Sequence, residues 1–325
     1  MKLRTPGLAL LAAAAVMPSG AALAQADFPS KSIRLVVGFP PGGISDVLGR
    51  AIAARLTQSL GQQVVVDNRA GAGTTIASDI VARAPADGYT LFMQDVTTHA
   101  INASLYRKLP YDSVKDFTGV SLVAFTPLML VVHPSLPVKN VKELIALAKA
   151  RPGQIAYGSS GNGTILHLSA DYFNSVAGTK MIHVPYKGSA PAVQALLGGE
   201  VALVFSSMPP AIAAMKAGRV RALGVTTPKR VEAAPEVPTI SESGLKGYEI
   251  VLYSGILGPG NLPAGVTAKL NAELTKLVGA ADFRQTLLTA GAEGMTSRPE
   301  EFRPFLEREI AKLARIVKES GAKVD

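Results

Sequence analysis

The sequence predicts an α/β protein with largely parallel sheets. Short apolar runs rich in β-branched residues alternate with stretches of helical periodicity, which is the pattern of repeated strand–helix units. Loops rich in glycine or proline stand at several strand-to-helix junctions, and no repeat, low-complexity tract or long linker interrupts the order. The expected strands, each with the helix that follows it, are 33–37 with 46–60, 63–67 with 74–83, 155–157 with 165–176, 181–184 with 190–197, and 201–205 with 209–217.

The first expected helix illustrates the periodicity. Apolar residues recur every four positions and predict one buried face, made of Ile44, Leu48, Ile52, Leu56 and Leu60. Gly61 then supplies the left-handed stop at the C-terminal end, which a residue with a Cβ would resist. Asp46 lies in the first turn, where the helix dipole favours a negative charge. A dipole or capping role for Asp46 is therefore as good an interpretation as ligand binding.

The first 24 residues differ in character from the rest. Lys2 and Arg4 precede an apolar stretch over 8–17, and Ala22-Leu23-Ala24 has the small-x-small pattern of a cleavage site. The apolar stretch is shorter than the roughly 20 residues of a membrane-spanning helix. Residues 1–24 are therefore expected to be a signal peptide, so that the mature protein begins at or near Gln25. The chain has no cysteine, and a periplasmic location suits it.

Composition excludes several functional classes. The formal charge of +9 is spread along the chain, aromatic residues make up 6%, and there is no tryptophan, so nucleic-acid binding is not expected. The histidines lie far apart without metal-ligand spacing, and neither a metal nor a cofactor is expected; they are His99, His133, His167 and His183. After residue 24 no apolar stretch is long enough to cross a bilayer. The mature protein is therefore expected to be soluble.

Three strand-to-helix junctions have the composition of an anion site. They are 39–43 (FPPGG), 159–164 (SSGNGT) and 185–189 (PYKGS). Glycine lets the backbone approach a ligand closely, and the free N–H groups of a helix start attract anions. Each loop taken alone is equally well explained as a tight turn. Three together favour a ligand site at the carboxyl ends of the strands.

Nucleotide and enzyme signatures are incomplete. No lysine follows either glycine loop in the phosphate-loop register, and Gly71-Ala72-Gly73 lacks the third glycine of the dinucleotide fingerprint. The run 158–162 (GSSGN) resembles the nucleophile elbow, but Asn162 replaces its last glycine. No reactive hydroxyl is visibly paired with a base. An enzyme is therefore not expected, and a secreted α/β serine hydrolase of a small ester or amide is the alternative.

The sequence contains, in this order, the motifs FPPGG-x-SD, DNRAGAG, APADGYTL, LPYDSVKDF, YGSSGNG-x-x-x-HL, HVPYKGSAPA and AGRVRALGVT. Together they resemble the substrate receptors of tripartite tricarboxylate transporters, the Bug or TctC family. The similarity runs from about Phe28 to the C-terminus. It implies a periplasmic binding protein of the type II class, with two α/β lobes and a ligand cleft between them. Lobe 1 is expected over 25–125 and 251–325, and lobe 2 over 126–250.

The resemblance also implies a ligand and partners. The ligand is a small organic carboxylate, held by the first Pro-Gly loop and by the Ser/Gly loop of the second lobe. The receptor is expected to be a monomer that serves the membrane permease subunits of the transporter, with service to a sensor as the other possibility. The implied ligand-binding residues are Phe39, Pro41, Gly42, Gly43, Ile44, Ser45 and Asp46, then Ser159, Ser160, Gly161, Asn162, Gly163 and Thr164, with Thr97, Thr98, Lys187 and Ser207 as further neighbours.

Three positions depart from the common pattern of the family. Ile44 replaces a small residue, Ser206-Ser207 replaces an acidic or amide residue, and Leu252 replaces a tryptophan. These positions concern the body of the ligand and not its carboxyl group. If Ile44 faces the cleft, the pocket should prefer a carboxylate with an apolar or aromatic body. If Ile44 only extends the buried helix face, it says nothing about the ligand.

Overall fold

The computed structural model describes residues 28–324. The expected signal peptide, residues 1–24, lies outside this range and stays a prediction. Within 28–324, no helix combines the length and the apolar composition that crossing a bilayer requires.

Strands and helices follow one another in the predicted alternating order. The strands are β1 (Ile33–Val37), β2 (Val64–Asn68), β3 (Thr90–Asp95), β4 (Phe117–Val132), β5 (Ala156–Ser159), β6 (Ile182–Pro185), β7 (Leu203–Ser207), β8 (Arg221–Val225), β9 (Val251–Pro259) and β10 (Glu293–Gly294). The helices are α1 (Ile44–Leu60), the short 3₁₀ helix η1 (Ala72–Thr74), α2 (Thr75–Ala82), α3 (Val96–Leu105), α4 (Val141–Ala150), α5 (Ile165–Ala177), α6 (Ser189–Leu197), α7 (Met208–Lys216), α8 (Ala264–Gly279), α9 (Ala281–Thr289) and α10 (Pro299–Ser320).

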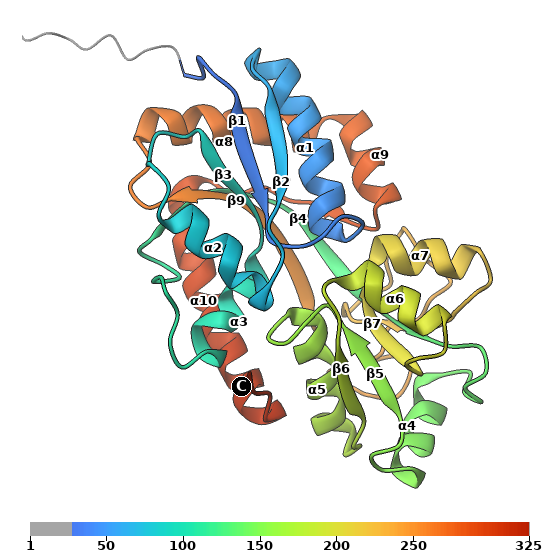
Figure 1. Cartoon of the computed structure of the whole chain (residues 1–325). Coiled ribbons are helices and arrows are strands. Elements are labelled where there is room, and N and C mark those ends of the chain that lie inside the picture. Colours follow the sequence, from blue (N-terminus) through green and yellow to red (C-terminus); the bar gives the residue numbers. More distant parts are fainter. Residues whose placement is uncertain (1–27, 325) are drawn as a thin grey trace, which may run out of the picture.

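Two lobes share the long strand β4 (Figure 1). The strand order is β2-β1-β3-β9-β4-β7-β5-β6. β4 pairs with β9 as far as Pro127 and with β7 from Leu128 onward, so it passes from the sheet of lobe 1 into the sheet of lobe 2. The predicted lobe boundaries, at 125/126 and 250/251, stay a prediction.

The strands predicted from the sequence are confirmed, and their ends agree with the structure to within one or two residues. They pair in parallel within each lobe, β1 with β2 and β5 with both β6 and β7. The strands that connect the lobes were not predicted, and they run antiparallel to their neighbours. The reason is geometric, because β4 carries the chain into lobe 2 and β9 carries it back beside β4. The sheet is therefore mixed.

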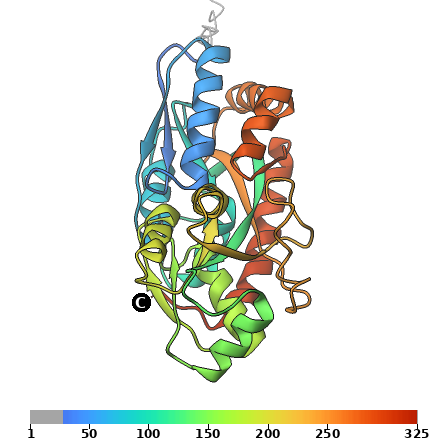
Figure 2. The same ribbon diagram turned by 90° about the vertical axis from the view of Figure 1, so that its right-hand side faces the viewer.

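The core of lobe 1 contains the predicted face of α1. Ile44, Leu48, Ile52 and Leu56 are all buried, and Leu60 is partly buried. Gly61 ends the helix in the left-handed conformation, at φ 68°. The C-terminal helix α10 packs against α3 of lobe 1 and α5 of lobe 2, and Figures 1 and 2 show it running from one lobe toward the other. The two lobes therefore share a strand and a helix.

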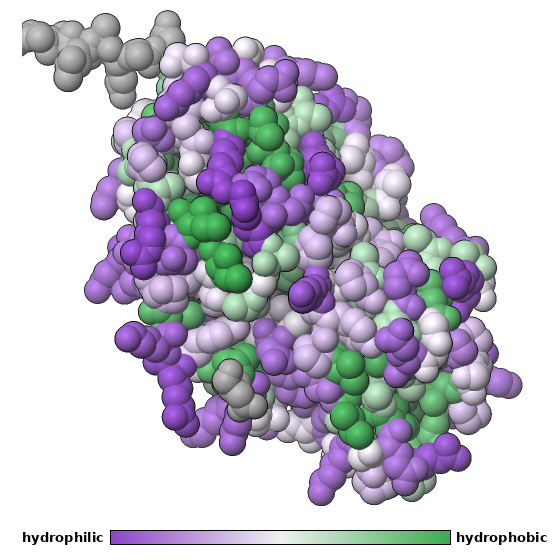
Figure 3. Space-filling view, in the orientation of Figure 1, coloured by the Kyte–Doolittle hydropathy of each residue, from purple (hydrophilic) through white to green (hydrophobic). Residues whose placement is uncertain are grey.

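The surface seen in Figure 3 is mostly hydrophilic, with apolar residues in separate patches. The most exposed large apolar side chains of the described residues are Val65, Ile76, Val176 and Ile182. They belong to β2, α2, α5 and β6, so they are spread over both lobes. Scattered exposed apolar residues are usual on a soluble protein and need no binding role.

Candidate ligand site between the lobes

A small cavity of about 20 Å³ lies between the lobes. Lobe 1 and the connecting strand β9 contribute Phe39, Pro40, Gly43, Ile44, Ser45, Asp95 and Leu252, and lobe 2 contributes Ser160, Leu166, Ser189 and Ser207. An outer groove of about 480 Å³ shares Phe39, Pro40 and Ser160 with this inner cavity. The inner cavity therefore lies next to a larger space.

Five helices begin at the cavity. Its lining includes the N-caps of α1, α3 and α7 (Gly43, Asp95 and Ser207) and first-turn residues of α5 and α6 (Leu166 and Ser189). This convergence follows from the fold, because each helix follows a strand and the parallel strands of each lobe end at the same edge. The positive ends of five helix dipoles therefore surround one small space, which favours a negative charge there.

Two of these helices have free backbone donors. The N-caps of α1 and α6 are Gly43 and Gly188, which have no side chain to accept hydrogen bonds from the first turn. The first N–H groups of an α-helix also have no partner within the helix. Amide groups at the starts of α1 and α6 are therefore available to an anion.

Ser207 lines the same space and has an unpaired hydroxyl. It is 2% exposed, and its Oγ has no hydrogen-bond partner among the described residues. A serine at an N-cap normally accepts from the amides two or three residues later. Here those residues are Pro209 and Pro210, which have no N–H to give. The two prolines thus leave the hydroxyl free for a ligand.

Ser160 is the residue of the second loop that lines the inner cavity. Its hydroxyl donates to Thr164 Oγ1 at 2.9 Å, and Thr164 in turn donates to the Gly161 carbonyl at 2.9 Å. Thr164 is the N-cap of α5 and fully buried, so it shapes the loop from beneath. Gly161 and Asn162 line the outer groove instead, together with the exposed Lys187.

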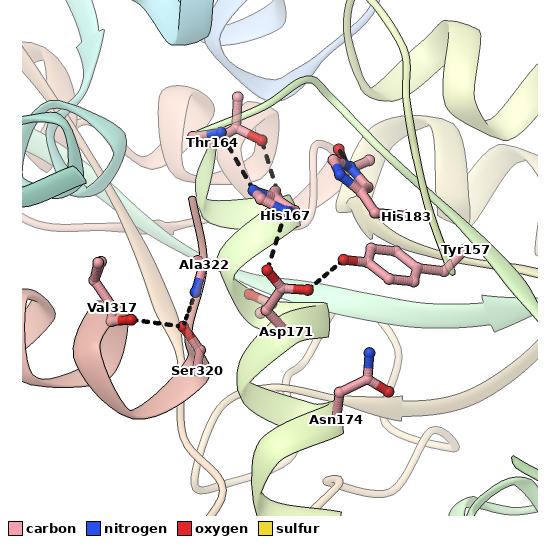
Figure 4. A network of polar contacts seen from close by, with 12 residues as sticks. Tyr157, Thr164, His167, Asp171, Asn174, His183, Val317, Ser320 and Ala322 are labelled. Carbon is pink, nitrogen blue, oxygen red and sulfur yellow. Dashed lines mark hydrogen bonds and ion pairs between the residues drawn. The ribbon is translucent and has the colours of Figure 1, made fainter. Parts of the chain in front are cut away.

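A buried polar network supports this loop from below (Figure 4). The rings of His167 and His183 stack at 3.9 Å, and His167 Nε2 lies 3.0 Å from Asp171. The Tyr157 hydroxyl donates to the other oxygen of the same carboxylate. Burial lowers the pKa of His183 to about 4, and the neighbouring His167 acts in the same direction. His183 is therefore neutral near pH 7.

His183 also contacts Ser159, and this pair bears on the hydrolase alternative. Ser159 Oγ lies 2.6 Å from His183 Nε2, which is hydrogen-bond distance for a nucleophile and its base. However, Ser159 is fully buried, does not line the cavity, and accepts a hydrogen bond from the Gly161 amide. The hydrogen bond between Ser159 and His183 therefore anchors the loop 159–164 and lies outside the cavity. The stacking of His167 on His183 was not predicted from the sequence, because the packing of α5 beside β6 brings together residues that are distant in the chain.

Asp46 holds the first loop against α1. Its carboxylate accepts from the Gly42 amide at 3.1 Å, from Asn68 at 3.0 Å and from Arg50 at 2.9 Å. Burial by itself would raise the pKa of Asp46, but the hydrogen bonds from Arg50, Asn68 and Gly42 outweigh it and keep the pKa below its usual value. The carboxylate is therefore ionised and takes part in hydrogen bonds within the protein. This agrees with a structural role for Asp46, which the sequence favoured as much as ligand binding.

Thr97 and Thr98 connect elements to one another. Thr97 Oγ1 accepts from the Tyr253 amide at 2.8 Å and lies 3.2 Å from the Val251 carbonyl, which fixes α3 to β9. Thr98 Oγ1 donates to Asp95 at 2.7 Å and accepts from the Ile165 amide of lobe 2 at 3.1 Å. Both hydroxyls are thus used within the protein.

Asp95 lines the cavity and was not among the site residues predicted from the sequence. It ends β3 and caps α3, accepting from the Thr98 amide at 2.9 Å. Burial raises its pKa to about 6, although the hydrogen bonds from Thr98 act in the opposite direction. The sequence does contain a signal for Asp95 as a helix cap: it is an acidic residue at the end of an apolar strand, with a threonine three positions later.

The predicted site residues therefore fall into three groups. The inner cavity is lined by Phe39, Gly43, Ile44, Ser45, Ser160 and Ser207, and the outer groove by Phe39, Ser160, Gly161, Asn162 and Lys187. Neither space is lined by Pro41, Gly42, Asp46, Thr97, Thr98, Ser159, Gly163 and Thr164. The inner cavity also includes Pro40, Asp95, Leu166 and Ser189, which were not among the predicted site residues.

Residues 48–322 match the family model described as tripartite tricarboxylate transporter family receptor. The chain belongs to this family. The protein BugT of Bordetella pertussis is 36% identical over 298 residues, which cover 91% of each chain. The predicted two-lobed α/β fold and the family assignment are therefore both confirmed.

Two solved structures resemble this receptor closely. The structure described as R. palustris Rpa4515 with adipate has a TM-score of 0.89 and 38% identity, covering 92% of this chain and 100% of that one. MatC (Rpa3494) from Rhodopseudomonas palustris with bound malate has a TM-score of 0.85 and 30% identity, covering 89% and 100%. Members of the family are periplasmic receptors for small carboxylates that serve tripartite transporters. The chain is accordingly a solute receptor and not an enzyme, and the hydrolase alternative has no support.

Proposed function

We propose that this receptor binds the carboxyl group of a small organic acid in the inner cavity. The observation that carries the proposal is the meeting of five helix N-termini around the unpaired hydroxyl of Ser207. Such an arrangement supplies N–H and O–H donors without a cationic side chain, which suits a carboxylate. The adipate and malate bound by the two structural relatives support the same class of ligand.

The walls of the cavity favour an apolar ligand body. Phe39, Ile44, Leu166 and Leu252 contribute apolar surface. Ile44 is 3% exposed, so it both completes the buried face of α1 and borders the ligand space. A ligand with many polar groups would leave some of them without partners against these walls. We therefore infer an aliphatic or aromatic carboxylate, including a dicarboxylate whose body extends toward the outer groove.

Ligand access requires the lobes to separate. The cavity of about 20 Å³ holds roughly one water-sized group, which is less than any organic acid needs. Contacts between the lobes close it on one side: a Cβ on Gly188, which has φ 139°, would lie only 2.6 Å from Pro40 Cγ. Glycine is needed here both for this conformation and for the close approach. A hinge opening of the lobes is thus part of the proposed function.

We further propose the cellular role that the family suggests. The chain is exported through residues 1–24, acts as a monomer in the periplasm, and delivers its ligand to the permease subunits of a tripartite transporter. The expected mature N-terminus at or near Gln25 follows from the same proposal.

A ligand panel tests the binding function. We expect adipate, malate and aromatic monocarboxylates to be distinguished by their effect on thermal unfolding, with apolar acids binding best. A ligand at about 100 times its Kd adds roughly 2.7 kcal/mol to the free energy of unfolding, a shift of several degrees in Tm. The absence of any shift across the carboxylates, together with hydrolysis of small esters or amides, would contradict the proposal.

Replacing Ser160 with alanine should weaken ligand binding by about 1 kcal/mol or more, because we expect the Ser160 hydroxyl to turn from Thr164 Oγ1 to the ligand carboxylate, and the variant loses this hydrogen bond to a charged acceptor. Calorimetry with the best ligand of the panel measures the effect. Ser169→Ala is the matched control, since Ser169 is fully buried in α5 but does not line the cavity. Equal affinities of the wild type and Ser160→Ala would place the ligand elsewhere.

A further inference from the structure

We propose that Asp95 makes ligand binding proton-coupled: the ligand carboxylate is bound together with one proton from solvent, which it shares with the Asp95 carboxyl group. The protonation of the Asp95 carboxyl group then determines whether the site accepts the ligand carboxylate. This inference rests on the proposed function, because it assumes a carboxyl group in the inner cavity.

The position of Asp95 brings the two carboxyl groups together. Asp95 is 1% exposed and lines the cavity with the same helix starts that are proposed to hold the ligand. Its oxygens accept from the amide and the hydroxyl of Thr98, so the side chain is held in place. Each carboxylate oxygen can accept a further hydrogen bond. A ligand carboxyl group held by these helix starts therefore lies beside Asp95, which lines the same space.

No cation compensates this pair among the described residues. The cavity lining contains no lysine, arginine or histidine, and Asp95 makes no salt bridge within 28–324. Burial raises the pKa of Asp95, and the hydrogen bonds from Thr98 and Thr97 lower it. The hydrogen-bond partner of the Asp95 carboxylate is Thr98, and none of the titratable groups on the elements packed against β3 and α3 is bonded to it. These groups are Arg34 on β1, Asp46, Arg50 and Arg55 on α1, Asp79 on α2, His99 on α3, His167, Asp171 and Tyr172 on α5, Tyr253 on β9, and Glu300, Glu301, Arg303, Glu307, Arg308, Glu309, Lys312, Arg315, Lys318 and Glu319 on α10.

Physical chemistry then requires a proton. Two carboxylates in contact within a dry site cannot both be ionised, so one of them takes up a proton and the pair shares it in a hydrogen bond. Burial already raises the pKa of Asp95 to about 6. A ligand carboxylate raises it further, because a like charge disfavours ionisation. Between about pH 6.5 and pH 8 the free receptor is mostly ionised at Asp95, whereas the complex carries the shared proton.

Calorimetric titration with adipate across this pH range tests the inference. The Kd of the wild type should rise about tenfold per pH unit, because one proton is taken up per ligand. Asp95→Asn should remove this pH dependence and bind about tenfold or more tightly than the wild type at pH 8, since its amide donates the hydrogen bond that the shared proton otherwise supplies. Asparagine is also a good N-cap, so α3 is expected to keep its start. Asp79→Asn is the control, because Asp79 lies on the surface of lobe 1 in a salt bridge with Arg83.

A second measurement needs no variant. Titrations of the wild type in two buffers of different ionisation heat report the number of protons taken up, which should be about one per adipate near pH 8. A Kd independent of pH, no proton uptake, or an Asp95→Asn variant that keeps the wild-type slope would overturn the inference while leaving the proposed function intact. Failure to bind adipate, malate and the other carboxylates at any pH would overturn the proposed function, and this inference with it.

Discussion

Replacing Ser207 with aspartate is expected to weaken carboxylate binding by roughly 100- to 1,000-fold. The new carboxylate would stand at a residue that lines the cavity, in place of a hydroxyl that has no partner among the described residues. Two like charges about 4 Å apart repel by about 4 kcal/mol at an effective dielectric constant of about 20, and each 1.4 kcal/mol is about a factor of ten in Kd. Calorimetry with the best carboxylate of the panel measures the loss.

The controls separate charge from folding. Ser207→Ala removes the hydroxyl without adding a charge, so it should cost only about 1 kcal/mol of binding. Position 207 is the N-cap of α7, where the helix dipole favours a negative charge, so Ser207→Asp is expected to fold. Thermal unfolding without ligand checks this. A folded Ser207→Asp protein with wild-type affinity would show that the ligand carboxyl group is not held at this helix start.

Replacing Phe302 with alanine is expected to lower the free energy of unfolding by about 3–5 kcal/mol. Phe302 is 1% exposed and joins α10 to the strands that connect the lobes. Its ring lies against the backbone of Gly119 in β4 and Gly255 in β9: a Cβ on Gly119 would collide with it, and a Cβ on Gly255 would lie only 3.0 Å away. The loss combines the burial of the ring with the cavity left behind, since two glycines offer no side chain to fill the space.

Phe305→Ala is the matched control on the same helix. Phe305 is only partly buried and contacts Tyr253 edge to face. Its replacement should cost clearly less, because less apolar surface is lost and solvent can enter the space. Urea unfolding of the two variants gives the comparison. Equal losses would mean that the contacts of the Phe302 ring with Gly119 and Gly255 do not add to stability.

Much of the local structure could be predicted from the sequence. The periodic apolar residues from Ile44 to Leu56 predicted the buried face of α1, and Gly61 predicted its C-terminal end. Both predictions were possible because periodicity and capping depend on residues a few positions apart. The same local rules placed the loops 39–43, 159–164 and 185–189 at the starts of α1, α5 and α6. The motifs of these loops, taken in order, also indicated the family.

The site needed information that no local pattern carries. Thr97 and Thr98 were expected near the ligand, but their hydroxyls bond to β9, to Asp95 and to lobe 2. Thr164 was expected to contact the ligand, but it is buried beneath Ser160 as the cap of α5. In each case the residue type fits a ligand contact, and only its neighbours in space decide its role.

The sequence by itself determined the strands and helices that it predicted, the glycine caps and the family, because these follow from neighbouring residues and from the order of motifs along one chain. Only the tertiary structure decided that Asp95 and Ser207, which lie in different lobes, line one cavity. That meeting depends on the strand order β2-β1-β3-β9-β4-β7-β5-β6 and on β4 passing between the lobes. Pairing of strands that are distant in the chain is set by the packing of the whole core, so the charge, donors and walls of the site emerge only when the lobes come together.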